Sequence, residues 1–90
     1  MKVRSVRIPS HVRSVIDEDG AVLLDLKEGK YFSLNRAATA IWLKLEAGGA
    51  IPEIEAHLVG MYDASLEAVH ADLDTFLSRL KRERLLEADG

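Results

Sequence analysis

The sequence predicts one α+β domain in which a three-stranded antiparallel sheet is followed by three helices. Three observations lead to this prediction. Residues 12–34 form short apolar segments separated by glycine-containing turns, and residues 35–80 keep a helical period. The chain has 90 residues, of which 48% are hydrophobic, and this suits a single small core. We expect residues 1–10 to form a basic N-terminal arm and residues 11–88 to form the domain.

The expected strands are residues 12–16, 21–26 and 30–34. The second reads AVLLDL and the third reads KYFSL. Tight turns join them, and Gly20 can adopt the positive φ that such a turn often requires. Two short turns in succession predict an antiparallel meander, whose first and third strands are its edges. Asp25, an acid inside an apolar strand, should accept a structural hydrogen bond, because burying an unpaired carboxylate is unfavourable.

The first two helices have clear boundaries. Asn35 is a good N-cap for the first helix, and Gly48-Gly49 ends it. Pro52 suits the first turn of the second helix. The inner face of the second helix is expected to consist of Ile54, Leu58 and Met61.

The third helix has the strongest periodicity. Ser65 should cap it, and Leu85-Leu86 should fold back on the core after it ends. Helices two and three, joined by a short turn, predict a winged helix-turn-helix-like fold in which the hairpin resembles a wing. The apolar stripe of the third helix is expected to be Leu66, Val69, Leu73, Phe76, Leu77 and Leu80.

Several classes of protein are excluded by composition. The chain has no cysteine, so it has no disulfide, thiolate metal site or cysteine nucleophile. It has neither the apolar run of roughly 20 residues that spans a bilayer nor a secretory signal. We therefore expect a cytoplasmic protein with no membrane partner.

The sequence shows no arrangement of residues typical of an active site. The serines are not in a nucleophile context, and there is no glycine-rich phosphate loop. His70 and Asp74 lie four residues apart on a helix, but a metal site needs at least a third ligand. We expect no enzymatic activity, no cofactor and no metal.

A winged-helix DNA-binding regulator is the alternative function. The expected recognition helix, residues 66–80, carries Glu67, Asp72 and Asp74 against Arg79 alone. Residues 1–16 have a net charge of +4, and residues 17–90 have a net charge of −7. DNA phosphates would repel such a helix, so we expect no nucleic-acid partner.

The strand at residues 30–34 is a weakly protected sheet edge. It contains one lysine, no proline and two aromatic residues. The unpaired N–H and C=O groups of such an edge can accept an extended peptide as an added strand. Two alternatives stay open at this point. Either the first strand or the basic arm covers the edge, or Tyr31 and Phe32 are only core residues.

Residues 19–42 also carry a family resemblance. They read DGAVLLDL at 19–26 and GKYFSLN at 29–35, followed by Ala38 and Ile41-Trp42. This pattern resembles the PqqD-like domains, which are the precursor-peptide recognition elements of ribosomal-peptide (RiPP) modification pathways. Within this family, the closer resemblance is to the stand-alone form from lasso-peptide biosynthesis. The resemblance extends over roughly residues 8–86, and Arg84 departs from it, because glycine is expected before Leu85-Leu86.

The resemblance implies a function in peptide delivery. The leader segment of a precursor peptide would add antiparallel to the third strand, in the groove between that strand and the third helix. The protein would act as an adaptor that presents the leader to a cysteine-protease-like leader peptidase and possibly to an ATP-dependent cyclase. The resemblance assigns the strand edge to Lys30, Tyr31, Phe32, Ser33 and Leu34. Helical periodicity selects the opposite wall of the groove as Val69, Asp72, Leu73 and Phe76.

Overall fold

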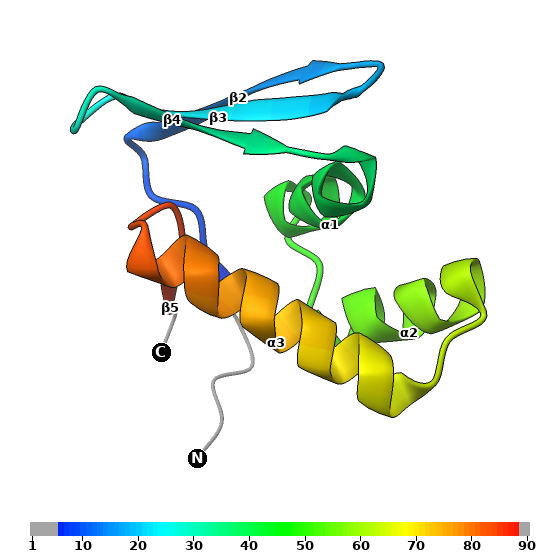
Figure 1. The fold of residues 1–90 in the computed structure, drawn as a ribbon. Coiled ribbons are helices and arrows are strands. Elements are labelled where there is room, and N and C mark those ends of the chain that lie inside the picture. The colour runs from blue at the N-terminus through cyan, green and yellow to red at the C-terminus, as the bar shows by residue number, and fades with distance from the viewer. Residues whose placement is uncertain (1–5, 89–90) are drawn as a thin grey trace.

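The computed structural model describes residues 6–88 and confirms the α+β architecture (Figure 1). Its main sheet is antiparallel with strand order β2-β3-β4, comprising β2 (Val12–Asp17), β3 (Gly20–Asp25) and β4 (Lys30–Leu34). The helices that follow are α1 (Arg36–Glu46), α2 (Ile51–Tyr62) and α3 (Leu66–Arg82). Helix α1 lies against β3 and β4, and α2 packs against α3. None of the described helices is long and apolar enough to cross a membrane.

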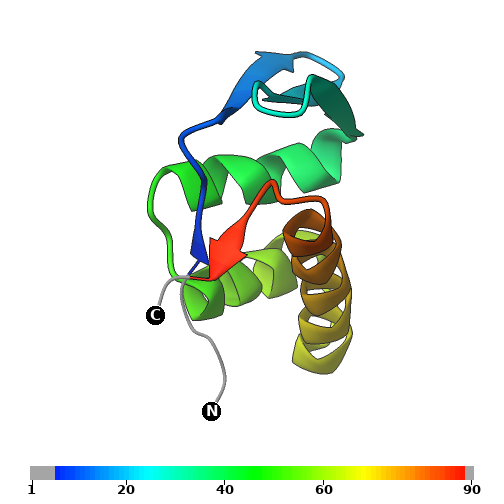
Figure 2. The same ribbon diagram turned by 90° about the vertical axis from the view of Figure 1, so that its left-hand side faces the viewer.

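The structure adds two short strands that the sequence did not predict. β1 (Val6–Arg7) pairs antiparallel with β5 (Glu87–Ala88), and Figure 2 shows the two side by side. Arg7 Nη2 donates a hydrogen bond to Glu87 Oε2 at 2.6 Å. Strands of two residues are too short to show a period in the sequence. The described part of the expected arm is therefore tied to the C-terminal segment, and residues 1–5 lie outside the described residues.

The core lies where the sheet, α1 and the α2–α3 pair meet. Trp42 of α1 and Leu23 of β3 are fully buried. From the other side, Ile54 of α2 and Leu73 and Leu80 of α3 are buried with them. These are large apolar side chains from every layer, so the burial that stabilises the fold also fixes the position of α3 relative to the sheet.

The register of β4 decides which way its side chains point. Phe32 pairs with Leu23, and Tyr31 pairs with Leu24. Because successive residues of a strand face opposite sides of the sheet, Phe32 shares the inner face with buried Leu23 and packs against the core. Tyr31 is 74% exposed on the outer face. The interpretation of both aromatic residues as core residues is therefore wrong for Tyr31.

The predicted helix caps are confirmed. The side chain of Asn35 accepts a hydrogen bond from the N–H of Ala38 at 2.8 Å, and Ser65 accepts one from the N–H of Ala68 at 3.1 Å. The prediction that the apolar stripes of α2 and α3 are buried is wrong for two of their residues. Met61 and Leu66 are 49% and 59% exposed, because both lie beside the turn that joins α2 and α3, at the outer end of this helix pair.

Helix α3 ends in a Schellman motif. Arg84 has a φ of +62°, the N–H of Leu85 donates to the carbonyl of Leu80 at 2.9 Å, and the N–H of Arg84 donates to the carbonyl of Lys81 at 3.0 Å. Leu85 and Leu86 are buried, which confirms that this segment folds back on the core. A left-handed backbone favours glycine, which is the residue that the family resemblance leads us to expect where this chain has Arg84.

Asp25 is a buried acid that holds the turn before β4. Its Oδ1 accepts hydrogen bonds from the N–H groups of Glu28 at 2.9 Å and Lys27 at 3.0 Å, as predicted for an acid in this strand. The hydrogen bond from Glu28 is the main reason that the pKa of Asp25 lies below its usual value of 3.8. Burial raises this pKa, and the hydrogen bond from Lys27 lowers it further. His11 and Lys30 add a smaller electrostatic contribution that also lowers this pKa.

Gly20 is required where β3 meets the end of β4. Its φ is +155°, and a Cβ on it would lie 2.1 Å from the carbonyl oxygen of Leu34. We expect Gly20→Ala to lower the free energy of unfolding by about 2 kcal/mol or more, because the strand pair must separate locally. Gly60→Ala in α2 is the control. Its Cβ meets nothing within 4 Å, so this change should raise stability by up to about 1 kcal/mol in urea denaturation. Equal effects of the two changes would contradict the predicted clash.

The lowered pKa of Asp25 predicts an acid-dependent loss of stability. The folded state favours the ionised carboxylate of Asp25. The contribution of this carboxylate to the free energy of unfolding is therefore complete above about pH 5, and it disappears as the pH falls through the pKa of Asp25 in the folded protein. The difference in unfolding free energy between wild type and Asp25→Asn should therefore shrink toward low pH in urea titrations. Asp17→Asn makes the same substitution at an exposed carboxylate that accepts the same kind of turn hydrogen bonds, so it controls for the change from carboxylate to amide in such a turn. A difference for Asp25→Asn that is constant with pH would refute the prediction.

Candidate functional site

One side of β4 is an open sheet edge. Among the strands of the described residues, β4 pairs only with β3, and β1 pairs with β5. Within residues 6–88, no backbone–backbone hydrogen bond outside the sheet ladder involves residues 30–34. The alternative that the first strand or the arm covers this edge is therefore wrong for the described residues. An edge in this state can pair with a further strand.

Helix α3 borders this edge and runs in the opposite direction to β4 (Figure 1). Two side-chain contacts join them. The guanidinium carbon of Arg79 lies 4.8 Å from the centre of the Phe32 ring, and Lys30 Nζ lies 3.9 Å from Glu83 Oε1. Helical spacing places four residues of α3, together with its C-cap residue, on the side that faces β4. This set, which we call the α3 stripe, consists of Ala68, Asp72, Phe76, Arg79 and Glu83.

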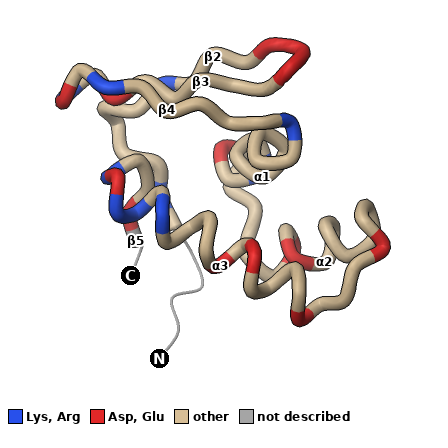
Figure 3. The backbone as a smooth tube through the Cα atoms, in the orientation of Figure 1, with Lys and Arg blue, Asp and Glu red and all other residues tan. Residues whose placement is uncertain are grey.

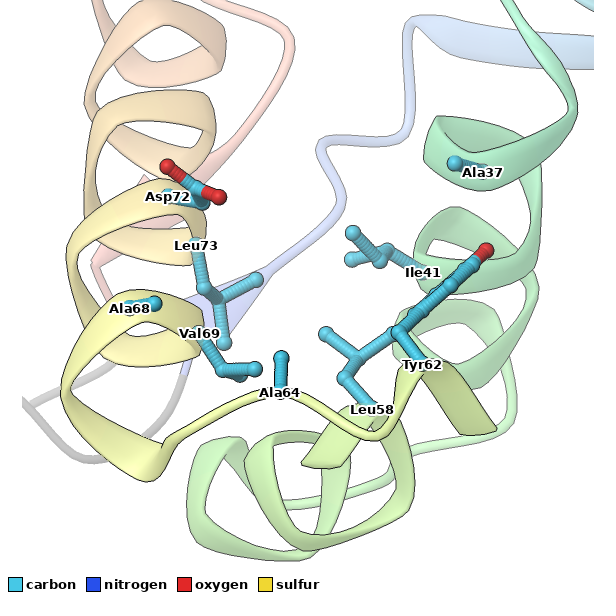
Figure 4. Close-up of a pocket in the computed structure, with 9 residues that line it drawn as sticks. All are labelled: Ala37, Ile41, Leu58, Tyr62, Ala64, Ala68, Val69, Asp72 and Leu73. Carbon is cyan, nitrogen blue, oxygen red and sulfur yellow. The ribbon is translucent and has the colours of Figure 1, made fainter. Parts of the chain in front are cut away.

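An apolar pocket lies beyond the C-terminal end of β4, where α1, α2 and α3 meet. It has a volume of about 200 Å³, and Figure 4 shows side chains from α1 and α2 facing those of α3 across it. Asp72 supplies the only carboxylate of its lining, on the α3 side. The full lining is Ala37, Ile41, Leu58, Tyr62, Ala64, Ala68, Val69, Asp72 and Leu73.

A smaller cavity lies at the other end of β4. It measures about 30 Å³, and its lining is Asp25, Lys30, Tyr31, Phe32, Glu83 and Leu85. Within the described chain, Oδ2 of Asp25 is buried without a hydrogen-bond partner. The strand edge thus runs from a charged end at Lys30 to an apolar end at the apolar pocket.

The structure brings the predicted helix residues together beside β4, with different degrees of burial. Val69 and Leu73 are buried and line the pocket, whereas Asp72 is exposed at its rim and Phe76 is half-buried. In β4, Phe32 points toward the helices. Tyr31 alternates to the opposite face of the sheet and is 74% exposed, although it also borders the small cavity at the Lys30 end of β4. The assignment of these residues to a binding site stays a prediction.

Sequence reasoning missed several residues of this site. Arg79 follows Phe76 by three positions, so helical spacing alone was a sufficient signal for it. Ile41 and Tyr62 were not detectable in this way, because α1 and α2 reach the pocket only through the tertiary fold.

His70, which was considered together with Asp74 for a metal site, has a different partner. Nδ1 of His70 contacts Oε2 of Glu55 on α2, which links the two helices. Among residues 6–88, no group of three or more His, Cys, Asp or Glu side chains is placed to hold a metal ion.

Two solved structures are similar to this chain along nearly its whole length. TbiB1 in complex with the TbiA(beta) leader peptide is 34% identical, with a TM-score of 0.88, over 93% of this chain and 98% of TbiB1. Lasso peptide synthetase B1 complexed with the leader peptide is 23% identical, with a TM-score of 0.84, over 91% of this chain and 96% of that protein. At that identity, the second likeness concerns the fold alone. No curated protein matches the chain significantly.

The family comparison covers both sides of the site. The model of Coenzyme PQQ synthesis protein D (PqqD) matches residues 20–86, which include the open edge of β4 and the whole of α3. The resemblance seen in residues 19–42 is thereby confirmed. The chain belongs to the PqqD family.

Proposed function

We propose that this protein binds the leader segment of a ribosomally made precursor peptide and acts as an adaptor, with no catalysis of its own. The observation that carries the proposal is the open edge of β4 beside the α3 stripe and the apolar pocket. Membership of the PqqD family and the similarity to TbiB1, which is itself in complex with a leader peptide, support it.

Strand addition explains how one small domain can hold an extended peptide. Main-chain hydrogen bonds to residues 30–34 supply affinity, and every second leader side chain faces the groove. A leader antiparallel to β4 runs parallel to α3, because β4 and α3 run in opposite directions. Its groove-facing side chains meet Phe32 and Phe76, and those nearer its N-terminus reach the apolar pocket.

We further propose that the bound leader is presented to a leader peptidase of the cysteine-protease type and to an ATP-dependent cyclase of lasso-peptide biosynthesis in the cytoplasm. Holding the leader raises the effective concentration of the attached core peptide near these enzymes. The adaptor accelerates their reactions by proximity and needs no catalytic residue.

A direct binding measurement tests the proposal. The probe is the fluorescently labelled leader of the precursor encoded beside this chain's gene, with the TbiA(beta) leader as a second probe. We expect a saturable rise in anisotropy with a Kd of about 1 µM or tighter for the cognate leader. A cognate leader that does not bind at roughly 100 µM protein would overturn the proposal. Tight, salt-sensitive binding of duplex DNA without leader binding would instead favour the regulator function.

Two neighbouring aromatic residues test which face of β4 receives the leader side chains. Phe32 points into the groove, and Tyr31 points to the opposite face. We expect Phe32→Ala to raise the leader Kd by roughly tenfold or more, since a buried aromatic contact is lost. Tyr31→Ala should change it by less than about twofold, because surface truncations are usually near neutral. If Phe32→Ala and Tyr31→Ala raised the leader Kd equally in the anisotropy titration, this assignment of faces would be rejected.

Filling the apolar pocket should compete with the leader. Ala68 is exposed and lines the pocket, so Ala68→Trp adds bulk there without opening the core. We expect the leader Kd to rise by about tenfold or more. Ala71→Trp is the matched control, because Ala71 is exposed on the same helix and does not line the pocket. Leu73 is unsuitable for this test, because it is 2% exposed and a polar replacement would disrupt the core. Unchanged binding by Ala68→Trp would exclude the pocket from the site.

A further inference from the structure

The α3 stripe carries two opposite charges that form no ion pair within the described part of the chain. Asp72 and Arg79 are both exposed. Among residues 6–88, neither has an oppositely charged side chain within 4.0 Å. Lys30 and Glu83, at the same end of the groove as Arg79, lie 3.9 Å apart and offset each other. The groove therefore offers one acidic position and one basic position to whatever lies along it.

Arg79 is held in place at the groove. Its guanidinium lies over the ring of Phe32, a cation–π contact that spans from α3 to β4. This contact uses the face of the guanidinium, so the N–H groups at its edge remain geometrically able to bind a carboxylate. A strand added to β4 passes beside Phe32 and therefore beside Arg79.

Asp72 and Arg79 are also ordered along the groove. Seven residues make two helical turns, so the two side chains lie on the same side of α3 about 10 Å apart along its axis. Figure 3 shows the same polarity in the whole helix, with acidic residues toward its N-terminal half and basic residues at its C-terminal end. An extended chain covers about 10 Å in three residues, and its groove-facing positions recur every second residue. Two groove-facing residues, two or four positions apart, can therefore reach both charges.

We propose that Asp72 and Arg79 select leaders according to the charges of two of their groove-facing side chains. Arg79 binds a carboxylate of the leader, and Asp72 binds a cationic group two or four residues closer to the leader's N-terminus. The order of the two signs follows from the direction of the leader, which runs parallel to α3. This inference rests on the proposed function and adds a specificity rule to it, because a leader with the opposite order of charges is repelled at both positions.

A charge scan tests the rule with the full-length chain. The probes are the cognate leader and its single Glu and single Lys replacements at each residue of the segment that pairs with β4. In wild type, we expect one position where Glu binds roughly three- to tenfold tighter than Lys. A second position, two or four residues toward the N-terminus, should prefer Lys. In Arg79→Glu the first preference should reverse, and in Asp72→Lys the second should reverse.

Lys81→Glu is the matched control. It changes the net charge by the same amount two residues further along α3, but helical spacing turns it to the side away from β4. It should shift the Kd of all probes alike and preserve both preferences.

Arg79→Gln is the second variant in case Arg79→Glu disturbs the fold, which circular dichroism would show. It should remove the Glu preference without reversing it.

The outcomes separate this inference from the function on which it rests. A cognate leader that fails to bind wild type overturns the proposed function. A leader that binds wild type but keeps the same Glu and Lys preferences in Arg79→Glu and Arg79→Gln overturns the charge rule alone. A Lys-preferring position on the C-terminal side of the Glu-preferring one also overturns the rule, because the leader would then run in the opposite direction.

Discussion

The pairing of β3 with β4 is the interaction on which the rest of the structure depends. Its register sets Phe32 opposite the fully buried Leu23, and this places one face of β4 against the core. The same pairing uses the hydrogen-bonding groups on one side of β4 and leaves the other side open. A shift of one residue would turn every side chain of β4 to the other face. The register therefore determines both the stability of the sheet and the chemistry of its open edge.

Both ends of β4 are held by features that favour this register. At its start, buried Asp25 accepts hydrogen bonds from two backbone N–H groups of the preceding turn. At its end, the absence of a Cβ at Gly20 lets β3 approach the carbonyl of Leu34 closely. Neither feature tolerates much change, because one involves a buried charge and the other a backbone contact. The edge thus belongs to a strand that is held at both ends, and preorganisation of this kind lowers the entropy lost when another strand is added.

Helix α3 serves the core and the proposed groove with different sides. Leu73, Leu77 and Leu80 are buried, and the Schellman motif at Arg84 turns Leu85 and Leu86 back to cover the end of the same core. The adjacent side carries the α3 stripe, whose exposed members are free to vary without loss of the core. This division allows the residues of the proposed groove to change while the core is kept. The core residues keep α3 beside β4, while Asp72 and Arg79 supply the proposed charge selection.

The sequence by itself determined the elements with strong local signals: the three strands of the meander, the caps at Asn35 and Ser65, and the periodic face of α3. It also determined that β4 would be an edge, because two short turns leave the third strand without a partner on one side. Only the tertiary structure decided the pairing of β1 with β5, the exposure of Met61 and Leu66, and the contact between Arg79 and Phe32. Local propensity and periodicity depend on residues near one another in the chain. Which side chains meet across the groove depends on how the burial of Trp42, Leu23 and Leu73 sets α3 against the sheet, and no short-range pattern contains that information.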